Sequence, residues 1–223
     1  MASHSAIITR LLVLILAITV RQTAAVNGKA SHYGGNLSGG NCMLTSYTIP
    51  AGTFGTAIAI SNYDNSNMCG VCLNVKGPSG SMKVMVVDSC PDCPPNKLDL
   101  FENGFSNIGD FNAGIVDVDW EVTPCDITEP LQVRNKDGTS KYWFSMQVLN
   151  SNQQVQSLEV STDGGATWQG TTRRPYNFFE KTSGGGFGAD SLTVRVTCVG
   201  GGQVTMQNVG VAGGSSFTAS GNC

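Results

Sequence analysis

Short runs of alternating apolar and polar residues, separated by glycine-rich stretches, follow one another along most of the chain. This two-residue period is typical of β-strands that bury one face. Only one short helix is indicated, in the segment "FENGFSNIG" that ends at Gly109. In the first half, the pattern predicts strands at Lys29–Tyr33, Gly55–Ser61, Val71–Lys76, Met82–Asp88 and Ile115–Val122.

The second half has the same character. The segment "STDGGATW" is a hairpin signal, with Asp163 and Gly164 at the turn. Several short strands with glycine-rich turns in about 95 residues are typical of a β-sandwich. The predicted strands here are Leu131–Arg134, Tyr142–Leu149, Gln156–Thr162, Leu192–Cys198 and Gln203–Val209.

The first 25 residues are patterned as a secretory signal peptide rather than as part of a fold. Arg10 precedes an apolar run from Leu11 to Val20, and small residues end the segment at Ala25. Ten apolar residues are too few to span a bilayer as a helix. We therefore expect a secreted protein whose mature chain begins near Val26, with no membrane-spanning part.

Composition and charge narrow the choice of partners. Hydrophobic residues make up 40% of the chain, charged residues only 13%, and there are 28 glycines. Without Arg10 and Arg21, 11 basic residues face 16 acidic ones, a net charge of 11 − 16 = −5. No basic stripe is present to neutralise phosphates, which argues against nucleic acid as a partner. Strongly acidic polymers are disfavoured for the same reason.

Eight cysteines remain after the signal peptide, and an even number in a secreted chain predicts disulfides. A zinc ribbon is the alternative, because two C-x-x-C pairs stand 17 residues apart. Secretion and the four further cysteines favour disulfides. The sequence alone does not determine the pairing. Our working pairing is Cys42–Cys69, Cys72–Cys125, Cys90–Cys93 and Cys198–Cys223.

The cysteines divide six and two, with the gap after Cys125, and a new strand pattern begins beyond Pro130. We expect a first domain at 26–126 and a second at 127–223. The first would carry 4 − 10 = −6 charges and the second 7 − 6 = +1.

Four segments of the first domain, in this order, resemble the expansins, including the compact microbial expansin-like proteins. They are "GKASHYGG", "VMVVDSCPDC", "KLDLFENGF" and "NAGIVDVDWEV". The second domain adds "KYWFSMQVLN", "RPYNFF" and "DSLTVRVT" in the expected order, so the resemblance covers nearly all of the mature chain. It implies an all-β protein, with an N-terminal double-psi β-barrel followed by a C-terminal immunoglobulin-like β-sandwich.

The resemblance also implies a polysaccharide-binding groove on the barrel. Its residues would be Asp99 in "LDL", Asp88 in "MVVDSCP", and Ser31 and Tyr33 in "ASHYGG". Alternation agrees for Asp99, because Leu98 and Leu100 on either side of it would share the opposite, buried face. Two departures from the family pattern stand out. Ser31 replaces a frequent threonine, and Ser89-Cys90 replaces a Leu-Tyr pair, which puts a groove aromatic there in doubt.

On the sandwich, the resemblance implies a flat line of three aromatic residues, which are Tyr142, Trp143 and Tyr176 here. Alternation in "YWFSMQV" would place Trp143 on an outer face with Ser145 and Gln147, opposite a core face of Phe144, Met146 and Val148. A large aromatic side chain on a polar face is a sign of binding. Packing of Trp143 against a loop is the alternative, and Trp168 is expected in the core.

Hydrolysis of a glycoside normally requires two carboxylates. Asp99 matches the acid of related barrel endoglucanases, but no Asp or Glu occurs from Val26 to Tyr63, where their base lies. Only Asp88 could replace it. We therefore expect a protein that binds cellulose or related glucan and loosens it without cutting it. The alternatives are a weak endoglucanase or lytic transglycosylase that uses Asp99, and a purely carbohydrate-binding protein.

His32 is the only histidine of the mature chain, which predicts neither a metal site nor a Ser–His–Asp triad. We expect no cofactor and a monomer that acts outside the cell, at the cell wall. Asn36-Leu37-Ser38 is a candidate glycosylation site on a glycine-rich loop.

Overall fold

The computed structural model describes residues 24–223. Residues 1–23, which make up nearly all of the predicted signal peptide, lie outside the described residues. Within 24–223, no helix combines the length and the apolar character that crossing a membrane would require.

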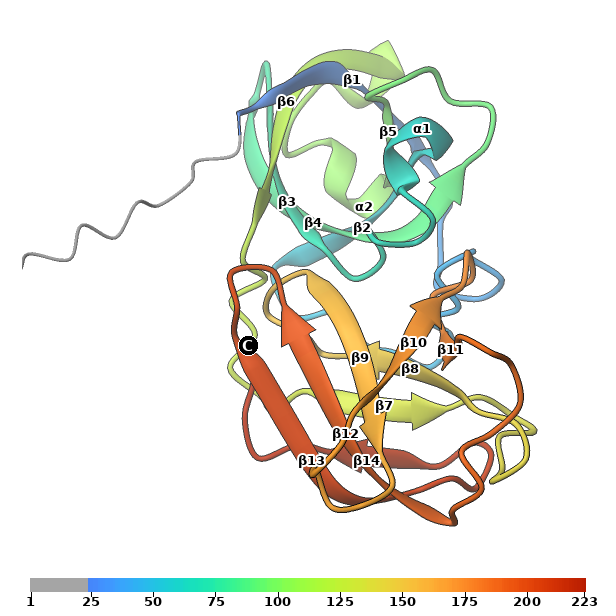
Figure 1. The fold of residues 1–223 in the computed structure, drawn as a ribbon. Coiled ribbons are helices and arrows are strands. Elements are labelled where there is room, and N and C mark those ends of the chain that lie inside the picture. The colour runs from blue at the N-terminus through green and yellow to red at the C-terminus, as the bar shows by residue number, and fades with distance from the viewer. Residues whose placement is uncertain (1–23) are drawn as a thin grey trace, which may run out of the picture.

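Six strands from the first half of the chain form a closed barrel (Figure 1). Their order around the barrel is β1-β5-β2-β4-β3-β6; the pairs β1 with β5 and β2 with β4 are parallel, and the other four pairs are antiparallel. The strands are β1 Val26–Tyr33, β2 Thr53–Ala59, β3 Cys72–Gly77, β4 Gly80–Cys90, β5 Leu98–Phe101 and β6 Ile115–Thr123.

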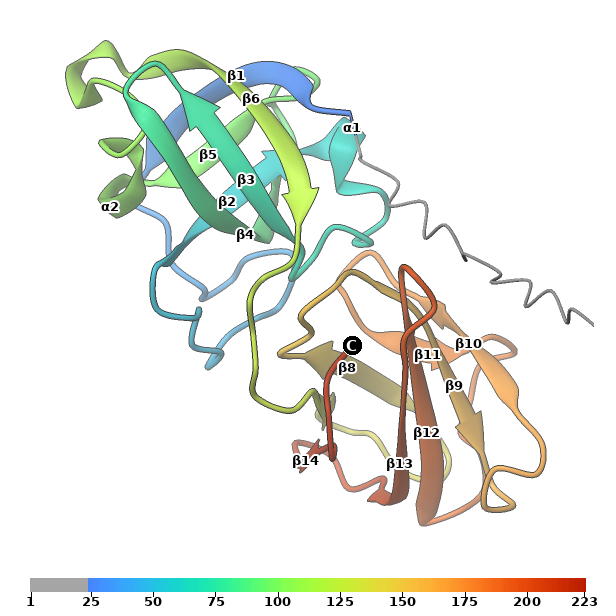
Figure 2. The ribbon, with the colours of Figure 1, turned by 90° about the vertical axis from the view of Figure 1, so that its left-hand side faces the viewer.

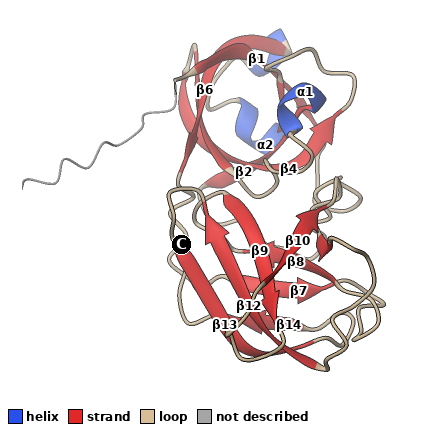
Figure 3. Cartoon of the chain, in the orientation of Figure 1, coloured by secondary structure: helices blue, strands red, loops and turns tan. Residues whose placement is uncertain are grey.

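Helical structure in the barrel domain is limited to single turns (Figure 3). These turns are α1 (Ile60–Tyr63), α2 (Glu102–Phe105) and the 3₁₀ turn η1 (Phe111–Ala113). The helix predicted to end at Gly109 is therefore shorter than expected. Its Phe105 is buried in the barrel core, with its ring 4.6 Å from that of His32.

The second half forms two packed layers, which are joined through β10 (Figure 2). One layer has the order β13-β12-β9-β10, and the other continues through β11, β8, β7 and β14. Apolar residues from both layers form one core, so the second half is a β-sandwich. The strands are β7 Gln132–Asn135, β8 Ser145–Leu149, β9 Val155–Ser161, β10 Gln169–Arg173, β11 Phe179–Lys181, β12 Ser191–Cys198, β13 Gln203–Gly210 and β14 Ser216–Thr218.

The all-β architecture with a barrel followed by a sandwich is confirmed, as is the hairpin at Asp163 and Gly164, which joins β9 to β10. The predicted strand Tyr142–Leu149 is wrong at its start, because regular pairing begins only at Ser145. Strands β10, β11 and β14 were not predicted. Each has only three to five residues and lacks an apolar alternation strong enough to stand out.

All eight cysteines are paired, as Cys42–Cys69, Cys72–Cys125, Cys90–Cys93 and Cys198–Cys223, which is the working pairing. No thiolate is left among them for the zinc alternative. The domain boundary at 126 and 127 stays a prediction. Ile127, assigned to the second domain, packs with the barrel core.

Candidate functional site: a carboxylate row on the barrel and aromatic residues on the sandwich

Four barrel strands bring four small or acidic residues to one level. Ser31 on β1 pairs with Asp99 on β5, and Asp99 also pairs with Ala57 on β2, which in turn pairs with Asp88 on β4. Residues directly opposite each other in a sheet project from the same face. The result is a row Ser31–Asp99–Ala57–Asp88 across the barrel wall, in which the short side chain of Ala57 separates the two carboxylates.

The direction in which Asp88 points depends on a β-bulge. Thr56 pairs with Val86, but the next residue, Ala57, pairs with Asp88, so Val87 is the extra residue. Without the bulge, Asp88 would project from the same face as Val86, which is fully buried in the barrel. Bulges of this kind commonly redirect side chains at functional sites. Here the bulge turns Asp88 to the outer face.

Each carboxylate of the row is held by donors from the chain. The Ser31 hydroxyl donates a hydrogen bond to Asp99 Oδ1 over 2.5 Å. Asp88 Oδ1 accepts hydrogen bonds from the backbone N–H groups of Asn41 (2.6 Å) and Ser89 (2.8 Å). No donor from residues 24–223 reaches Oδ2 of Asp88. Each carboxylate is thus oriented by the protein and still has an oxygen that can accept a hydrogen bond.

Tyr33 follows Ser31 on the same face of β1 and lies beside this row. Its ring packs edge-on against Phe101, with ring centroids 5.6 Å apart. Burial raises the pKa of Tyr33 to about 12, and the charges of Asp88 and then Asp99 add to the effect. The phenol therefore keeps its proton at neutral pH, and within residues 24–223 its hydroxyl has no hydrogen-bond partner. The row offers acceptors, and the Tyr33 hydroxyl is a donor that is buried beside it.

His32 points away from this row. It alternates with Ser31 along β1, and its ring stacks on that of Phe111 at 4.1 Å. It therefore cannot act as a base for Ser31, and the hydroxyl of Ser31 already donates to Asp99. No group of three or more His, Cys, Asp or Glu side chains within 24–223 is arranged to hold a metal ion.

The aromatic residues of the sandwich lie in loops rather than on a strand. Tyr142 and Trp143 belong to the turn before β8, which the backbone bridge between Ser140 and Trp143 closes. Tyr142 is 77% exposed, whereas Trp143 is half-buried over Gly138. The alternation argument for Trp143 is therefore wrong, because this residue precedes the strand.

The face of β8 that was expected to meet solvent is covered. Ser145 and Gln147 are fully buried. Ser145 lies against Glu180 on the neighbouring strand, to which its hydroxyl donates over 3.3 Å, whereas Gln147 meets the barrel domain. Gln147 Nε2 donates to the carbonyl of Cys42, over 2.9 Å. The core prediction for Trp168 is wrong as well. Its ring is half-buried on the other layer, with the Arg195 guanidinium 4.1 Å above it.

Tyr176 lies at the tip of a tight turn between β10 and β11, closed by a hydrogen bond from Arg174 N to Phe178 O. Its hydroxyl donates to Glu180 on β11, and Glu180 also accepts from Arg174 (2.8 Å) and Ser145 (3.3 Å). Burial, followed by this hydrogen bond and the charge of Glu180, raises the pKa of Tyr176. Because Glu180 pairs with Ser145, two residues after Trp143, it connects the two parts of the aromatic set.

Glu180 was missed by sequence reasoning. It is only 8% exposed, although it sits in "FFEK" as an ordinary strand acid. Only the strand pairing shows that it meets Ser145, Tyr176 and Arg174. Asn36 is exposed on the loop after β1, and its role as a glycosylation site stays a prediction.

A closed double-psi barrel followed by a β-sandwich, with a carboxylate row on the barrel, defines the class of this protein. Known proteins of this class are similar to most of this chain. Expansin-YoaJ of Bacillus subtilis is 33% identical over 201 residues, which cover 86% of this chain and 84% of that protein. Expansin-like protein 5 of Dictyostelium discoideum is 29% identical over 185 residues, which cover 79% and 76% of the two chains.

Among solved structures, the apo expansin of Clavibacter michiganensis is similar, with a TM-score of 0.79 and 30% identity over 89% of this chain and 98% of that chain. A mutant of the same expansin, solved in complex with cellohexaose, has the same similarity. No model of a protein family matches the sequence. The chain belongs to the expansin family.

Proposed function

We propose that this protein binds cellulose or related glucan chains of a cell wall and loosens the contacts between them without hydrolysis. The observation that carries the proposal is the pairing of Asp99 with Ser31. A glycosidase needs a second carboxylate across the scissile bond, and the first strand supplies a hydroxyl instead. In this proposal, Asp99, Asp88, Ser31 and Tyr33 form hydrogen bonds to the hydroxyl groups of one glucan chain.

The aromatic residues of the sandwich supply the second contact. Tyr142, Trp143 and Tyr176 would stack against the apolar faces of successive sugar rings, which favours a flat, extended glucan. The complex of the Clavibacter michiganensis expansin mutant with cellohexaose supports a β-glucan as the ligand. A glucan chain bound by both domains at once would favour conformations that differ from those in the packed wall, which is a population shift by differential binding.

The site of action in this proposal is outside the cell. The signal-peptide pattern and the four disulfides support an oxidising, extracellular compartment. The protein would act as a monomer on polysaccharide, without a cofactor and without nucleic acid or membrane as a partner.

A weak hydrolase is the second candidate, because Asp88 and Asp99 lie on either side of Ala57. With about 4.8 Å between neighbouring strands, their backbones are about 10 Å apart. Carboxyl groups of inverting glycosidases are separated by about 6.5–9.5 Å, so the row could accommodate a water molecule between them. The two donors that hold Asp88 Oδ1 favour a binding role instead.

One pair of assays on purified protein separates the candidates: extension of isolated cell walls, and release of reducing ends from soluble glucan. We expect extension without sugar release for the wild type. Asp99→Asn should lose extension but still bind cellulose, because Asn replaces one acceptor by a donor and removes the charge. Asp92→Asn, at an exposed loop position, is the matched control. Reducing ends released by the wild type but not by Asp99→Asn would establish the hydrolase instead.

The aromatic contact has its own test. Tyr142→Ala should weaken binding to insoluble cellulose and leave the free energy of unfolding unchanged, because the side chain is 77% exposed. Unchanged cellulose binding would exclude Tyr142 from the site.

A further inference from the structure

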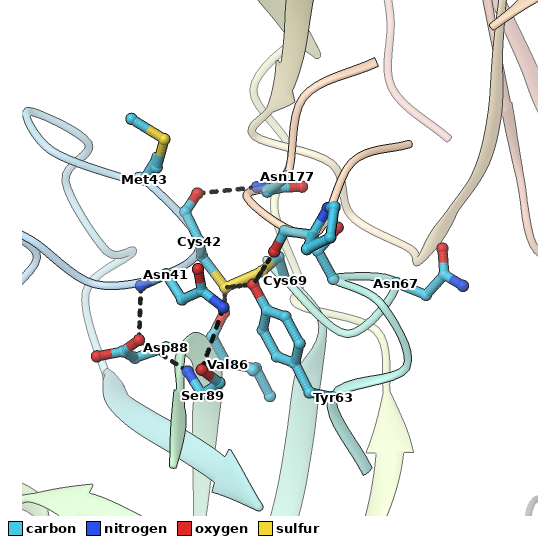
Figure 4. The surroundings of a disulfide bond; sticks show 12 residues. Asn41, Cys42, Met43, Tyr63, Asn67, Cys69, Val86, Asp88, Ser89 and Asn177 are labelled. Atoms are coloured by element: carbon cyan, nitrogen blue, oxygen red, sulfur yellow. Dashed lines mark hydrogen bonds between the residues drawn. A yellow bond between two sulfur atoms is a disulfide. The ribbon is translucent and has the colours of Figure 1, made fainter. Parts of the chain in front are cut away.

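One carbonyl oxygen at the junction of the two domains receives two side-chain amides. The carbonyl of Cys42, in the barrel loop between β1 and β2, accepts from Gln147 Nε2 at 2.9 Å. It also accepts from Asn177 Nδ2 at 3.1 Å (Figure 4). Gln147 lies on β8, and Asn177 follows Tyr176 in the turn before β11. Cys42, Gln147 and Asn177 are all buried. The barrel loop thus contacts both the docking face of the sandwich and the turn that carries Tyr176.

The disulfide Cys42–Cys69 joins this loop to the segment that begins at the end of α1, and two side chains of this segment bind the same turn. The Tyr63 hydroxyl donates to the carbonyl of Pro175 over 2.8 Å. Ser66 donates to the neighbouring carbonyl of Arg174 over 2.7 Å. Arg174, Pro175 and Asn177 of the turn are therefore all hydrogen-bonded to the barrel domain.

Tyr63 packs directly on the disulfide. Its hydroxyl oxygen lies 3.2 Å from the sulfur of Cys69 and 3.9 Å from that of Cys42. Disulfide sulfur atoms carry no proton to donate, so the single proton of the hydroxyl is free for Pro175. Burial raises the pKa of Tyr63, and the charge of Asp88 adds to this effect.

The other side of the same loop holds the groove. Asn41, which precedes Cys42, donates its backbone N–H to Asp88 (2.6 Å) and its side-chain amide to Ser89 (3.2 Å), as Figure 4 shows. An unbroken path of contacts therefore runs from Asp88 through Asn41, Cys42 and the disulfide to Tyr63. From Tyr63 it reaches Pro175, the neighbour of Tyr176.

We propose that Tyr63 and the Cys42–Cys69 disulfide are positioning residues that set the Tyr176 turn relative to Asp88, so that one glucan chain contacts both domains at once. This inference rests on the proposed function. Two weak sites held in fixed geometry bind one long ligand more tightly than two sites that move independently, because less orientational freedom is lost on binding. Neither Tyr63 nor the disulfide needs to touch the sugar.

The test is calorimetric titration of the full chain with cellohexaose, using two variants that disturb the path. Tyr63→Phe removes only the hydroxyl, and we expect about fivefold weaker binding, as for one lost hydrogen bond. Cys42→Ser combined with Cys69→Ser opens the path at the disulfide, and here we expect at least tenfold weaker binding.

Each variant has a matched control. Cys198→Ser with Cys223→Ser removes a disulfide of similar span, 25 residues against 27, so the effect on the unfolded chain is similar. Tyr47→Phe removes another hydroxyl between the domains, which donates to Asn150 at 3.3 Å but lies outside the path. Both controls should bind cellohexaose as the wild type does.

A coupling measurement separates positioning from mere support of the fold. In the wild type, the effects of Asp88→Asn and Tyr176→Ala on affinity should be non-additive, because both residues contact one ligand in a fixed geometry. In the Tyr63→Phe background, the two effects should become additive. If the disulfide variant does not fold, Tyr63→Phe decides the question by itself.

The outcomes also distinguish this inference from the proposed function. Wild-type protein that does not bind cellohexaose or cellulose would overturn the proposed function and, with it, the positioning role. Wild-type binding that persists unchanged in Tyr63→Phe, with the coupling intact, would overturn the positioning role alone. Equal losses in the path variants and in their controls would do the same.

Discussion

Glu180 offers a sharp test of the site, because three different groups depend on one buried carboxylate. It accepts hydrogen bonds from Tyr176 and Ser145 and pairs with Arg174. We predict that Glu180→Ala destabilises the sandwich and also weakens cellulose binding, although Glu180 itself does not face the sugar. The second effect arises because Tyr176 loses the partner that holds its ring.

The expected loss of stability follows from these contacts. A hydrogen bond to a charged group contributes about 1.5–3 kcal/mol, and the phenol of Tyr176 makes one to a carboxylate that is 8% exposed. The ion pair with Arg174 adds only about 0.5 kcal/mol, since the Arg174 side chain is 39% exposed and solvent screens the charge. The longer Ser145 contact adds little. We therefore expect Glu180→Ala to lower the free energy of unfolding by about 2–4 kcal/mol.

Urea unfolding followed by tryptophan fluorescence would measure this loss, and depletion from solution by cellulose would measure binding. Glu180→Gln keeps an acceptor for Tyr176, so it should bind cellulose nearly as the wild type does. Glu159→Ala is the control for loss of an ion pair, because Glu159 pairs with Arg195 in the other layer, at 2.8 Å. Wild-type cellulose binding by Glu180→Ala would refute the link between Glu180 and the aromatic site.

Three further predictions concern the turn before β8, the groove tyrosine and the sandwich hairpin. Gly186→Ala should weaken cellulose binding and destabilise the fold, because a Cβ there would lie 2.2 Å from the backbone oxygen of Lys141. Gly170→Ala is the control, because a Cβ at Gly170 would meet open space, and equal behaviour of the two variants would contradict the prediction. In an ultraviolet titration, the absorbance change that is present in the wild type and missing in Tyr33→Phe reports ionisation of the Tyr33 phenol. We expect it near pH 12, since burial and then the charges of Asp88 and Asp99 raise the pKa of Tyr33. The stability that neutral Tyr33 contributes is present below about pH 10 and is lost as pH rises through about 12, and ionisation near pH 10 would show an accessible phenol. Hydrogen bonds from Ser161 and then Thr167 lower the pKa of Asp163 to about 2, so the stability that its carboxylate contributes is present above about pH 4 and is lost as pH falls through about 2. In acid unfolding, the free energy of unfolding of Asp163→Asn should therefore approach that of the wild type over this range. A difference that stays constant with pH would contradict the prediction.

The sequence by itself determined the fold class and the order of the strands with regular alternation. Local side-chain polarity records which face of a strand is buried, and Asp99 between the buried Leu98 and Leu100 is an example. Cysteine count and the signal-peptide pattern likewise predict an oxidising compartment without any knowledge of contacts. The segments that carry the family resemblance named Asp88, Ser31 and Tyr33 as candidates, but not how they meet.

Only the tertiary structure decided which faces are exposed once the domains dock. Ser145 and Gln147 follow a polar alternation, yet both are fully buried, because Gln147 donates to the barrel carbonyl of Cys42 and Ser145 to Glu180 of the sandwich. A polar face that is satisfied by protein groups has the same sequence pattern as a face that is satisfied by water. The outward turn of Asp88 depends on a bulge at Val87, which arises from the pairing of two strands and leaves no local signal. Glu180 and Tyr63 acquire their roles from residues far away in the chain. Long-range contacts of this kind are set by packing, and a single sequence does not record them.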